Sequence, residues 1–145
     1  MKGLLELYTS KPVTKRIVLQ SAGKIYDPVG ILSPYTIKLK CLLQELWMRK
    51  LAWDDELPPD MHATWLQWWS ELPLLSELKI PQMILDSSAG DSSEIRIHIF
   101  SDASQRAYGA STFLRVKHKD RISVDLVTSK SRVAPLKKLS CPDWN

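Results

Sequence analysis

Cysteine and glycine are scarce in this sequence of 145 residues, and each shortage excludes a class of site. Cys41 and Cys141 lie far apart and form no Cys-x-x-Cys pair, which excludes a disulfide framework and a cysteine-based zinc site. The five glycines are scattered, so no glycine-rich phosphate loop is present. No apolar run approaches the roughly 18 residues of a membrane span, and MKGLLELYTS makes a poor signal peptide. We therefore expect a soluble intracellular protein, in the cytoplasm or the nucleus, with no membrane partner.

Tryptophan, by contrast, is abundant, and five of the six copies fall between positions 47 and 69. Such a cluster indicates either a compact aromatic core or an exposed platform for a protein partner. The core is the favoured interpretation, because large aromatic side chains bury much area and contiguous exposed apolar patches are uncommon. The platform would make the chain a non-catalytic protein-interaction module that binds through its Trp-rich helices.

Charge of one sign is confined to segments, although the whole chain carries only +4. Residues 1–50 carry a net charge of +6, residues 51–100 carry −7, and residues 101–145 carry +5. Basic segments attract nucleic acid by counterion release. Charge alone favours the plainer interpretation of solvated helix and turn surfaces.

The first 85 residues have helical periodicity. Thr14 predicts the N-cap of a short helix that reaches Ser21 and ends at Gly23. Ser33 and Pro34 predict the start of a long helix that runs to about residue 53. A third helix is expected from about residue 61 to residue 72, where Pro73 would stop it.

The period changes from 3.6 to 2 after the polar loop SSAGDSSE (87–94). Strands are expected over 95–102, 107–116 and 121–129, joined by tight turns. The fold class is therefore α+β, an N-terminal helical segment followed by an antiparallel three-stranded meander. We divide the chain into a lead-in (1–13), a helical region (14–85) and a sheet region (94–145).

Asp102 lies at the end of the first expected strand, within IFSDASQRAYGAS (99–111). A carboxylate there can hold a divalent cation such as Mg²⁺, which prefers oxygen ligands. One carboxylate cannot position the two ions of a two-metal nuclease, so others would have to converge on it. From spacing alone, the plainer interpretation is a residue that forms a turn.

Three motifs in fixed order carry a family resemblance: IYDPVGILSP (25–34), SDASQRAYGA (101–110) and SKSRVAPLK (129–137). With the Trp-rich helix between the first two, the chain resembles part of the Pol polyprotein of Bel/Pao-type LTR retrotransposons, over roughly residues 14–140. The region is commonly labelled Pao retrotransposon peptidase, or peptidase family A17. It resembles the thumb- and connection-like helices of a reverse transcriptase that run into an RNase H-like domain.

The resemblance implies that Asp102 is the first catalytic carboxylate of an RNase H-like site. Gly109 matches the small residue that opens the second strand, and residues 129–131 match the end of the third. The family's next helix carries a catalytic Glu, but here the chain reads LSCPDWN. The resemblance therefore implies a truncated fragment with an incomplete RNase H-like sheet, inactive alone. Mg²⁺ would serve the intact family enzyme, and no cofactor is expected for this chain.

The implied partners are an RNA–DNA hybrid and the rest of the Pol polyprotein. Because thumb helices lie along nucleic acid, the candidate contacts to its backbone are the basic residues of the first 40 positions: Lys11, Lys15, Arg16, Lys24, Lys38 and Lys40.

Two other activities have only partial motifs. Asp54-Asp55 are two adjacent aspartates, as in a polymerase palm, but they lie in a proline-flanked segment and are expected to form a solvated loop. Asp86-Ser87-Ser88 lacks the glycine of the aspartic peptidase turn, so the peptidase label rests on the family name and not on residues here.

Overall fold

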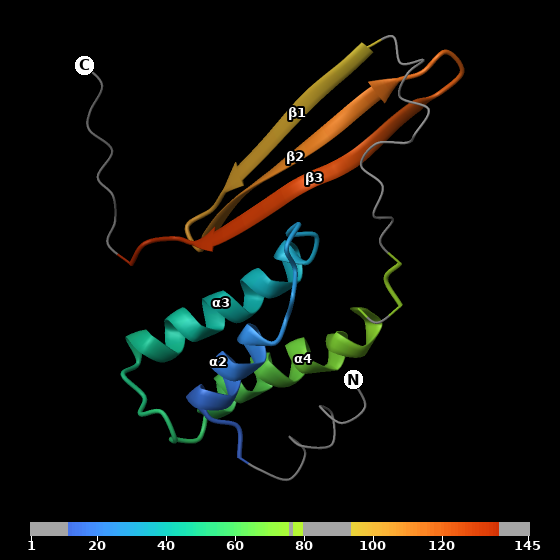
Figure 1. The fold of residues 1–145 in the computed structure, drawn as a ribbon. Helices are drawn as coiled ribbons and strands as arrows, with labels where there is room; N and C mark the ends of the chain where they lie inside the picture. Colours follow the sequence, from blue (N-terminus) through green and yellow to red (C-terminus); the bar gives the residue numbers. More distant parts are fainter. Residues whose placement is uncertain (1–11, 76, 80–93, 137–145) are drawn as a thin grey trace, which may run out of the picture.

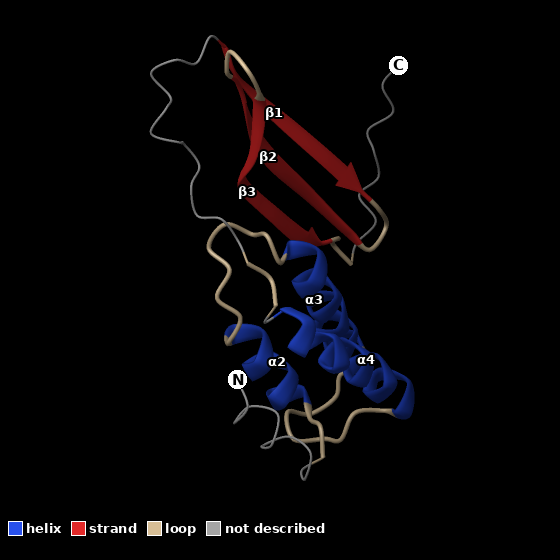
Figure 2. Cartoon of the chain, turned by 90° about the vertical axis from the view of Figure 1, so that its right-hand side faces the viewer, coloured by secondary structure: helices blue, strands red, loops and turns tan. Residues whose placement is uncertain are grey.

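The computed structural model describes residues 12–75, 77–79 and 94–136, in which three helices precede three strands (Figure 1). The elements are α2 (Lys15–Gly23), α3 (Ser33–Met48), α4 (Pro59–Leu75), β1 (Glu94–Ala103), β2 (Ala107–Lys117) and β3 (Ile122–Val133). The strands form one antiparallel sheet in the order β1-β2-β3. The helices gather beyond β3, and β1 is the strand farthest from them (Figure 2). The arrangement confirms the predicted α+β class.

Helix α2 begins as the sequence predicts, whereas α3 has Leu32 and not Ser33 as its N-cap and ends early. Thr14 caps α2 by accepting a hydrogen bond from the Ile17 amide at 3.5 Å. Helix α3 begins at Ser33 with Pro34 in its first turn and ends at Met48, not near residue 53. The chain leaves the helix there because Lys50 adopts a positive φ of 54°, a left-handed conformation that no helix continues.

Helix α4 is longer than expected at both ends. It starts at Pro59 and reaches Leu75, so the prediction that Pro73 ends it is wrong. Proline removes one backbone donor and disturbs the preceding turn, but it has a helical φ. Near the end of a helix that loss is confined to one hydrogen bond, and packing of Leu72 and Leu75 against the core favours the extra turn.

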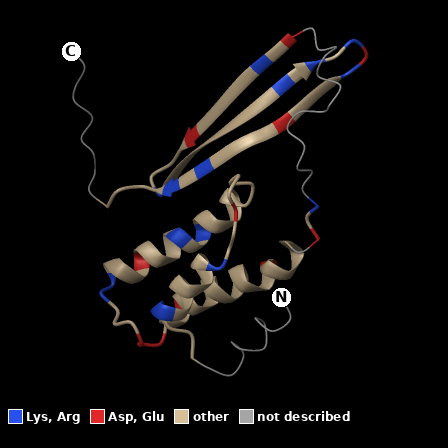
Figure 3. Cartoon of the chain, viewed as in Figure 1, with Lys and Arg blue, Asp and Glu red and all other residues tan. Residues whose placement is uncertain are grey.

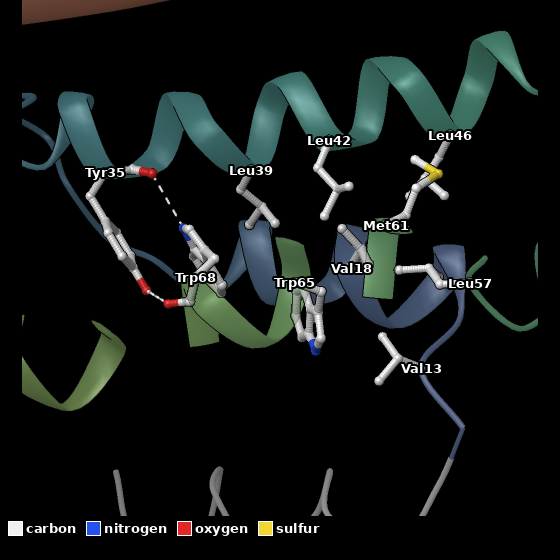
Figure 4. Packing of buried hydrophobic residues seen from close by; sticks show 10 residues of the cluster. All are labelled: Val13, Val18, Tyr35, Leu39, Leu42, Leu46, Leu57, Met61, Trp65 and Trp68. Atoms are coloured by element: carbon white, nitrogen blue, oxygen red, sulfur yellow. Dashed lines mark hydrogen bonds between the residues drawn. The ribbon is translucent and has the colours of Figure 1, made fainter. Parts of the chain in front are cut away.

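The three helices enclose one hydrophobic core (Figure 4). Its most deeply buried side chains are Val18, Leu39, Leu46, Met61 and Trp65. The apolar stripe of α3 therefore runs through Leu39, Leu42 and Leu46, whereas Trp47 is 53% exposed. Trp65 and Trp68 are 2% and 3% exposed, which confirms the core interpretation for this part of the tryptophan cluster.

Tyr35 and Trp68 join α3 to α4 by two reciprocal hydrogen bonds. The Tyr35 hydroxyl donates to the Trp68 carbonyl at 2.7 Å, and the Trp68 indole Nε1 donates to the Tyr35 carbonyl at 3.2 Å (Figure 4). Their rings stack with centroids 4.8 Å apart. Each polar atom that these two large side chains bury thus has a partner, which burial requires.

The turn-rich segment 25–34 attaches the helices to the sheet. Asp27 folds it locally, because its carboxylate accepts hydrogen bonds from the amides of Gly30, Ile31 and Leu32 at 2.8–3.0 Å. The Val29 carbonyl then accepts a hydrogen bond from the Ser129 amide of β3 at 2.7 Å. Gly30 has a positive φ of 84° and lies directly against the Ser129 backbone.

The strands confirm the predicted meander, and β3 ends at Val133, four residues later than expected. A register shift between Thr112 and Phe113 marks a bulge in the pairing of β2 with β3. The residue that follows β3 contacts α3, since the Gln44 amide donates to the Ala134 carbonyl at 2.7 Å. Within the part of the chain that the structure describes, no helix combines the length and apolarity of a membrane-crossing segment.

Candidate functional site

The turn between β1 and β2 is organised by one serine. The Ser104 amide and hydroxyl both donate to the Ala107 carbonyl, at 2.8 and 3.0 Å. The Ser104 hydroxyl oxygen also accepts from the amides of Arg106 and Ala107 at 3.2 Å each. Serine is well suited to such a turn because its short side chain bonds its neighbours' backbone. The turn fixes where β1 ends and therefore where Asp102 lies.

Asp102 lies one residue before the end of β1 and opposite Gly109 of β2. Gly109 in turn lies opposite Ser131 of β3, so one row crosses all three strands on a single face. A Cβ at Gly109 would come within 3.2 Å of the Lys130 carbonyl, which favours glycine at this crowded position. The Asp102 side chain is exposed, and its Oδ1 accepts a hydrogen bond from the next amide, Ala103, at 2.8 Å.

The Asp102 row faces the start of α3. The Ser131 hydroxyl donates to the Ser33 carbonyl at 3.4 Å, and the neighbouring row holds a hydroxyl pair, Ser111 with Ser129, at 2.9 Å. A hollow of about 350 Å³ lies here, lined by residues of α3 and of all three strands, Asp102 among them. Asp102 is thus positioned by the sheet and faces a space that an extended ligand can reach.

The described residues do not by themselves fit a metal centre. No group of three or more His, Cys, Asp or Glu side chains converges anywhere in residues 12–75, 77–79 and 94–136. Mg²⁺ is usually bound by one or two protein carboxylates together with waters and substrate phosphates. Asp102 therefore belongs to no cluster of three or more such side chains among the described residues, and no metal-dependent step can be derived from them.

Lys15, predicted as a contact to nucleic acid, is buried instead. It is 3% exposed, its ammonium group donates to the Leu51 carbonyl at 3.1 Å, and it lies 3.4 Å from the centre of the Trp47 ring. The centre of the Trp53 ring lies 5.1 Å from the same ammonium nitrogen. Lys15 therefore connects α2 to the segment that follows α3. Because its side chain is buried, it is not accessible to a backbone phosphate of nucleic acid.

Two other predicted contacts are already paired with carboxylates. Arg16 forms a two-pronged ion pair with Asp54, at 2.8 and 3.1 Å, and Lys38 lies 3.1 Å from Glu71. The hydrogen bond with Arg16 lowers the pKa of Asp54 and raises the pKa of Arg16. Asp54 lies in an irregular, exposed loop, as predicted, and not between two strands. Lys24 is exposed at the end of α2.

Lys40 is the predicted contact that the structure brings to the sheet. Its ammonium group donates to the Ser131 carbonyl at 3.3 Å. Lys130 and Arg132 flank Ser131, and both are exposed. Figure 3 shows the resulting concentration of Lys and Arg on the end of β3 and on the neighbouring α3.

Lys130, Arg132 and Arg106 are site residues that sequence reasoning missed. In the register of the sheet, Lys130 and Arg132 lie one position on either side of the Asp102 row, on the opposite face. They line a second hollow, of about 630 Å³, to which Asp102 also contributes. Arg106, in the β1–β2 turn, lines a third hollow with Lys38 of α3. In the sequence, the alternation of serine and basic residues in SKSR (129–132) indicates that Lys130 and Arg132 share one face of a strand.

Three further expectations concern residues outside this site. The expected docking platform consists of Trp65, Trp68 and Trp69, but Trp65 and Trp68 are core residues and Trp69 is partly buried against that core. Lys11 and the Asp86-Ser87-Ser88 motif lie outside the described residues. The structure therefore does not test Lys11 or the Asp86-Ser87-Ser88 motif.

The comparison with known families gives one match. A family model described as the Pao retrotransposon-like RNaseH-like domain matches residues 14–144, nearly the whole chain. The chain therefore belongs to this family. No curated protein and no solved structure matches it.

Proposed function

From this family membership, we propose that the chain is the part of a retrotransposon Pol polyprotein where reverse-transcriptase helices run into the RNase H-like domain. Its contribution is to bind an RNA–DNA hybrid. The observation that best supports the proposal is the position of Asp102, near a strand end and at the same end of the sheet as basic residues of α3, β3 and the β1–β2 turn, although Lys130 and Arg132 lie on the opposite face of the sheet.

The charge around Asp102 suits a polyanionic ligand. Lys40, Arg106, Lys130 and Arg132 come from three parts of the chain, and the fold brings them to the same end of the sheet. Phosphate contacts of this kind position nucleic acid without reading its sequence, and each releases counterions. Arg16 contributes less to such a field, because Asp54 neutralises it.

In the intact polyprotein, Asp102 would be one of the carboxylates that hold Mg²⁺ and thereby support hydrolysis of the RNA strand. In the described part of this chain, Asp102 belongs to no group of three or more His, Cys, Asp or Glu side chains that could hold a metal ion. What its residues do is bind and orient a hybrid next to Asp102. We expect no nuclease activity from the chain alone.

Binding is tested with a fluorescent RNA–DNA hybrid and fluorescence anisotropy between about 50 and 200 mM salt. The affinity should fall steeply with salt. The double variant Lys130→Gln/Arg132→Gln should bind several times more weakly and with a shallower salt slope. Arg16→Gln removes one positive charge already paired with Asp54 and is the matched control. Binding that ignores salt and survives the double substitution would instead favour a protein-interaction module.

Activity is tested in the same mixtures with Mg²⁺ added. Intact hybrid after prolonged incubation is the expected result. Cleavage that disappears in Asp102→Asn would overturn the proposed inactivity and would establish Asp102 as catalytic. Peptidase activity, which the family label suggests, is tested separately with acid-range substrates and Asp86→Asn.

A further inference from the structure

The end of the sheet farthest from Asp102 carries three basic side chains on one face. Arg96 of β1 lies directly opposite Arg115 of β2. In the next row of this face, Glu94 lies opposite Lys117. Opposed residues of an antiparallel pair share a face, so these side chains project from the same side of the sheet as Asp102. Three positive charges and one negative charge leave this corner of the sheet with a net charge of +2.

The opposed arginines, Arg96 and Arg115, are an unfavourable pair. In such a pair the Cβ atoms lie about 5 Å apart, and like charges directly opposite one another destabilise the pairing. Arg96 has Glu94 as an ion-pair partner, whereas Arg115 forms no ion pair with another of the described residues. β3 does not compensate, because Val124 and Ile122 occupy these rows. An anion between the two guanidinium groups would remove the repulsion.

His98, in the adjacent row of the same face, adds a second group that lacks a partner. Its imidazole Nε2 is buried and has no hydrogen-bond partner within residues 12–75, 77–79 and 94–136. The ring lies beside that of Phe100, with centroids 6.5 Å apart, and His98 is opposite Phe113 on β2. Neither phenyl ring offers the nitrogen a conventional hydrogen bond. Buried polar atoms in native proteins nearly always have a partner, so an unsatisfied one points to a bound water, ion or ligand.

We propose that Arg96, Arg115 and His98 form an oxyanion site that takes a phosphate group. The two guanidinium groups supply forked N–H donors that match phosphate oxygens, and the imidazole donates the third hydrogen bond in the tautomer that carries its proton on Nε2. Arg96 is exposed and precedes His98 on this face, so its long side chain can move aside as the ligand reaches Nε2. Lys117 adds positive charge from the next row. A phosphate has enough oxygens to accept from all three side chains.

The oxyanion site is separate from the hollows around Asp102. Asp102 and Arg96 are six positions apart on one strand, a separation of about 20 Å at about 3.3 Å per residue. Lys130 and Arg132, which are proposed to contact the hybrid, lie at the Asp102 end and on the opposite face. Either site can therefore fail without the other. The phosphate belongs to a free phosphate compound or to the backbone of a nucleic acid, and the chemistry of recognition is the same for both.

Titration of the chain with inorganic phosphate, at constant pH and ionic strength, tests the site through the NMR signals of the histidine rings. The His98 signals should shift and saturate, whereas those of His62 on α4 should not move. Arg115→Gln should weaken binding by about tenfold or more. Arg115→Lys keeps the charge but loses the fork and should weaken binding less. Arg132→Gln removes the same charge at the other end of the sheet and is the matched control.

A substitution of His98 separates ligand binding from a purely structural role. His98→Phe removes the nitrogen that lacks a partner, so the free chain should be at least as stable in denaturant unfolding. Calorimetric titration with inorganic phosphate should nevertheless show weaker binding, a combination that a misfolded variant could not give. A variant that binds phosphate as tightly as the unmodified chain would contradict the role of His98 in the site.

A short oligothymidylate distinguishes the two sources of the phosphate. Saturation of the His98 shift at a much lower concentration of oligonucleotide phosphate than of inorganic phosphate assigns a nucleic-acid backbone, and equal or weaker binding assigns a free phosphate compound. The double variant Lys130→Gln/Arg132→Gln should weaken hybrid binding and leave the His98 titration unchanged, which keeps the two sites distinguishable. The absence of a saturable His98 shift, or a shift that Arg115→Gln leaves unchanged, would overturn the proposal.

Discussion

Gly30 lies so close to Ser129 that a Cβ on the glycine would fall 1.7 Å from the serine's carbonyl oxygen. Glycine is thus required here both by its positive φ and by the close approach of two backbones. The contact joins the segment IYDPVGILSP to the strand that ends in SKSR. Two motifs about a hundred residues apart in the sequence meet because the helical layer and the sheet are joined at this point.

Gly30→Ala should separate the segment from β3. The added methyl group meets backbone atoms, which cannot rotate away, so we expect a loss of about 2 kcal/mol or more in the free energy of unfolding. Hydrogen exchange at the Ser129 amide should become faster. Gly23→Ala is the matched control, since nothing lies within 4 Å of its Cβ, and alanine there should cost nothing or stabilise the helix slightly. Equal effects of the two substitutions would contradict this account.

Asp27→Ala should destabilise the same segment by a different route. Removal of the carboxylate leaves the amides of Gly30, Ile31 and Leu32 without their acceptor, at a cost of about 1–3 kcal/mol. Asp27→Asn retains one acceptor oxygen and should cost less. Denaturant unfolding of the three proteins gives the order. A chain in which alanine and asparagine behave alike would show that the carboxylate does not organise the turn.

Tyr35 should make stability fall in alkaline solution. Burial raises the pKa of the Tyr35 phenol above its ordinary value near 10, so the folded state holds this proton more tightly than the unfolded state. The stability is complete below pH 10 and decreases as pH rises beyond it. Tyr35→Phe should flatten this decrease and, at neutral pH, should cost about 1 kcal/mol for the lost hydrogen bond to Trp68. Tyr26→Phe, at a side chain that is 88% exposed, is the control.

Lys15→Met should destabilise the helical layer although it replaces a charge with an apolar group. The methionine keeps the apolar stem but leaves the Leu51 carbonyl without its donor and removes the cation above Trp47, a loss of about 1–3 kcal/mol. Thermal unfolding followed by tryptophan fluorescence measures it. Lys38→Met, which removes only an exposed ion pair, should change stability by less than about 1 kcal/mol. If Lys15→Met were neutral, the buried contacts of Lys15 would not contribute to stability.

The sequence by itself determined the local structure. Helical and strand periodicity predicted each element, Thr14 predicted a cap, and the alternation over residues 95–102 predicted that Asp102 lies near the end of a strand. These features depend on neighbouring residues, so a pattern of a few positions is enough to predict them. The errors occurred where the outcome depended on distant packing, as at Pro73, whose helix continues against the core.

Only the tertiary structure decided which charged and aromatic residues remain on the surface. Lys15 and Arg16 are adjacent and equally basic, yet one is buried beneath Trp47 and the other pairs in solvent with Asp54. Lys40 reaches Ser131 across 91 positions of sequence, which places it with Lys130 and Arg132. Exposure and proximity of this kind are set by how the helices pack on one another and on β3, and packing between distant segments leaves no periodic signal in the chain.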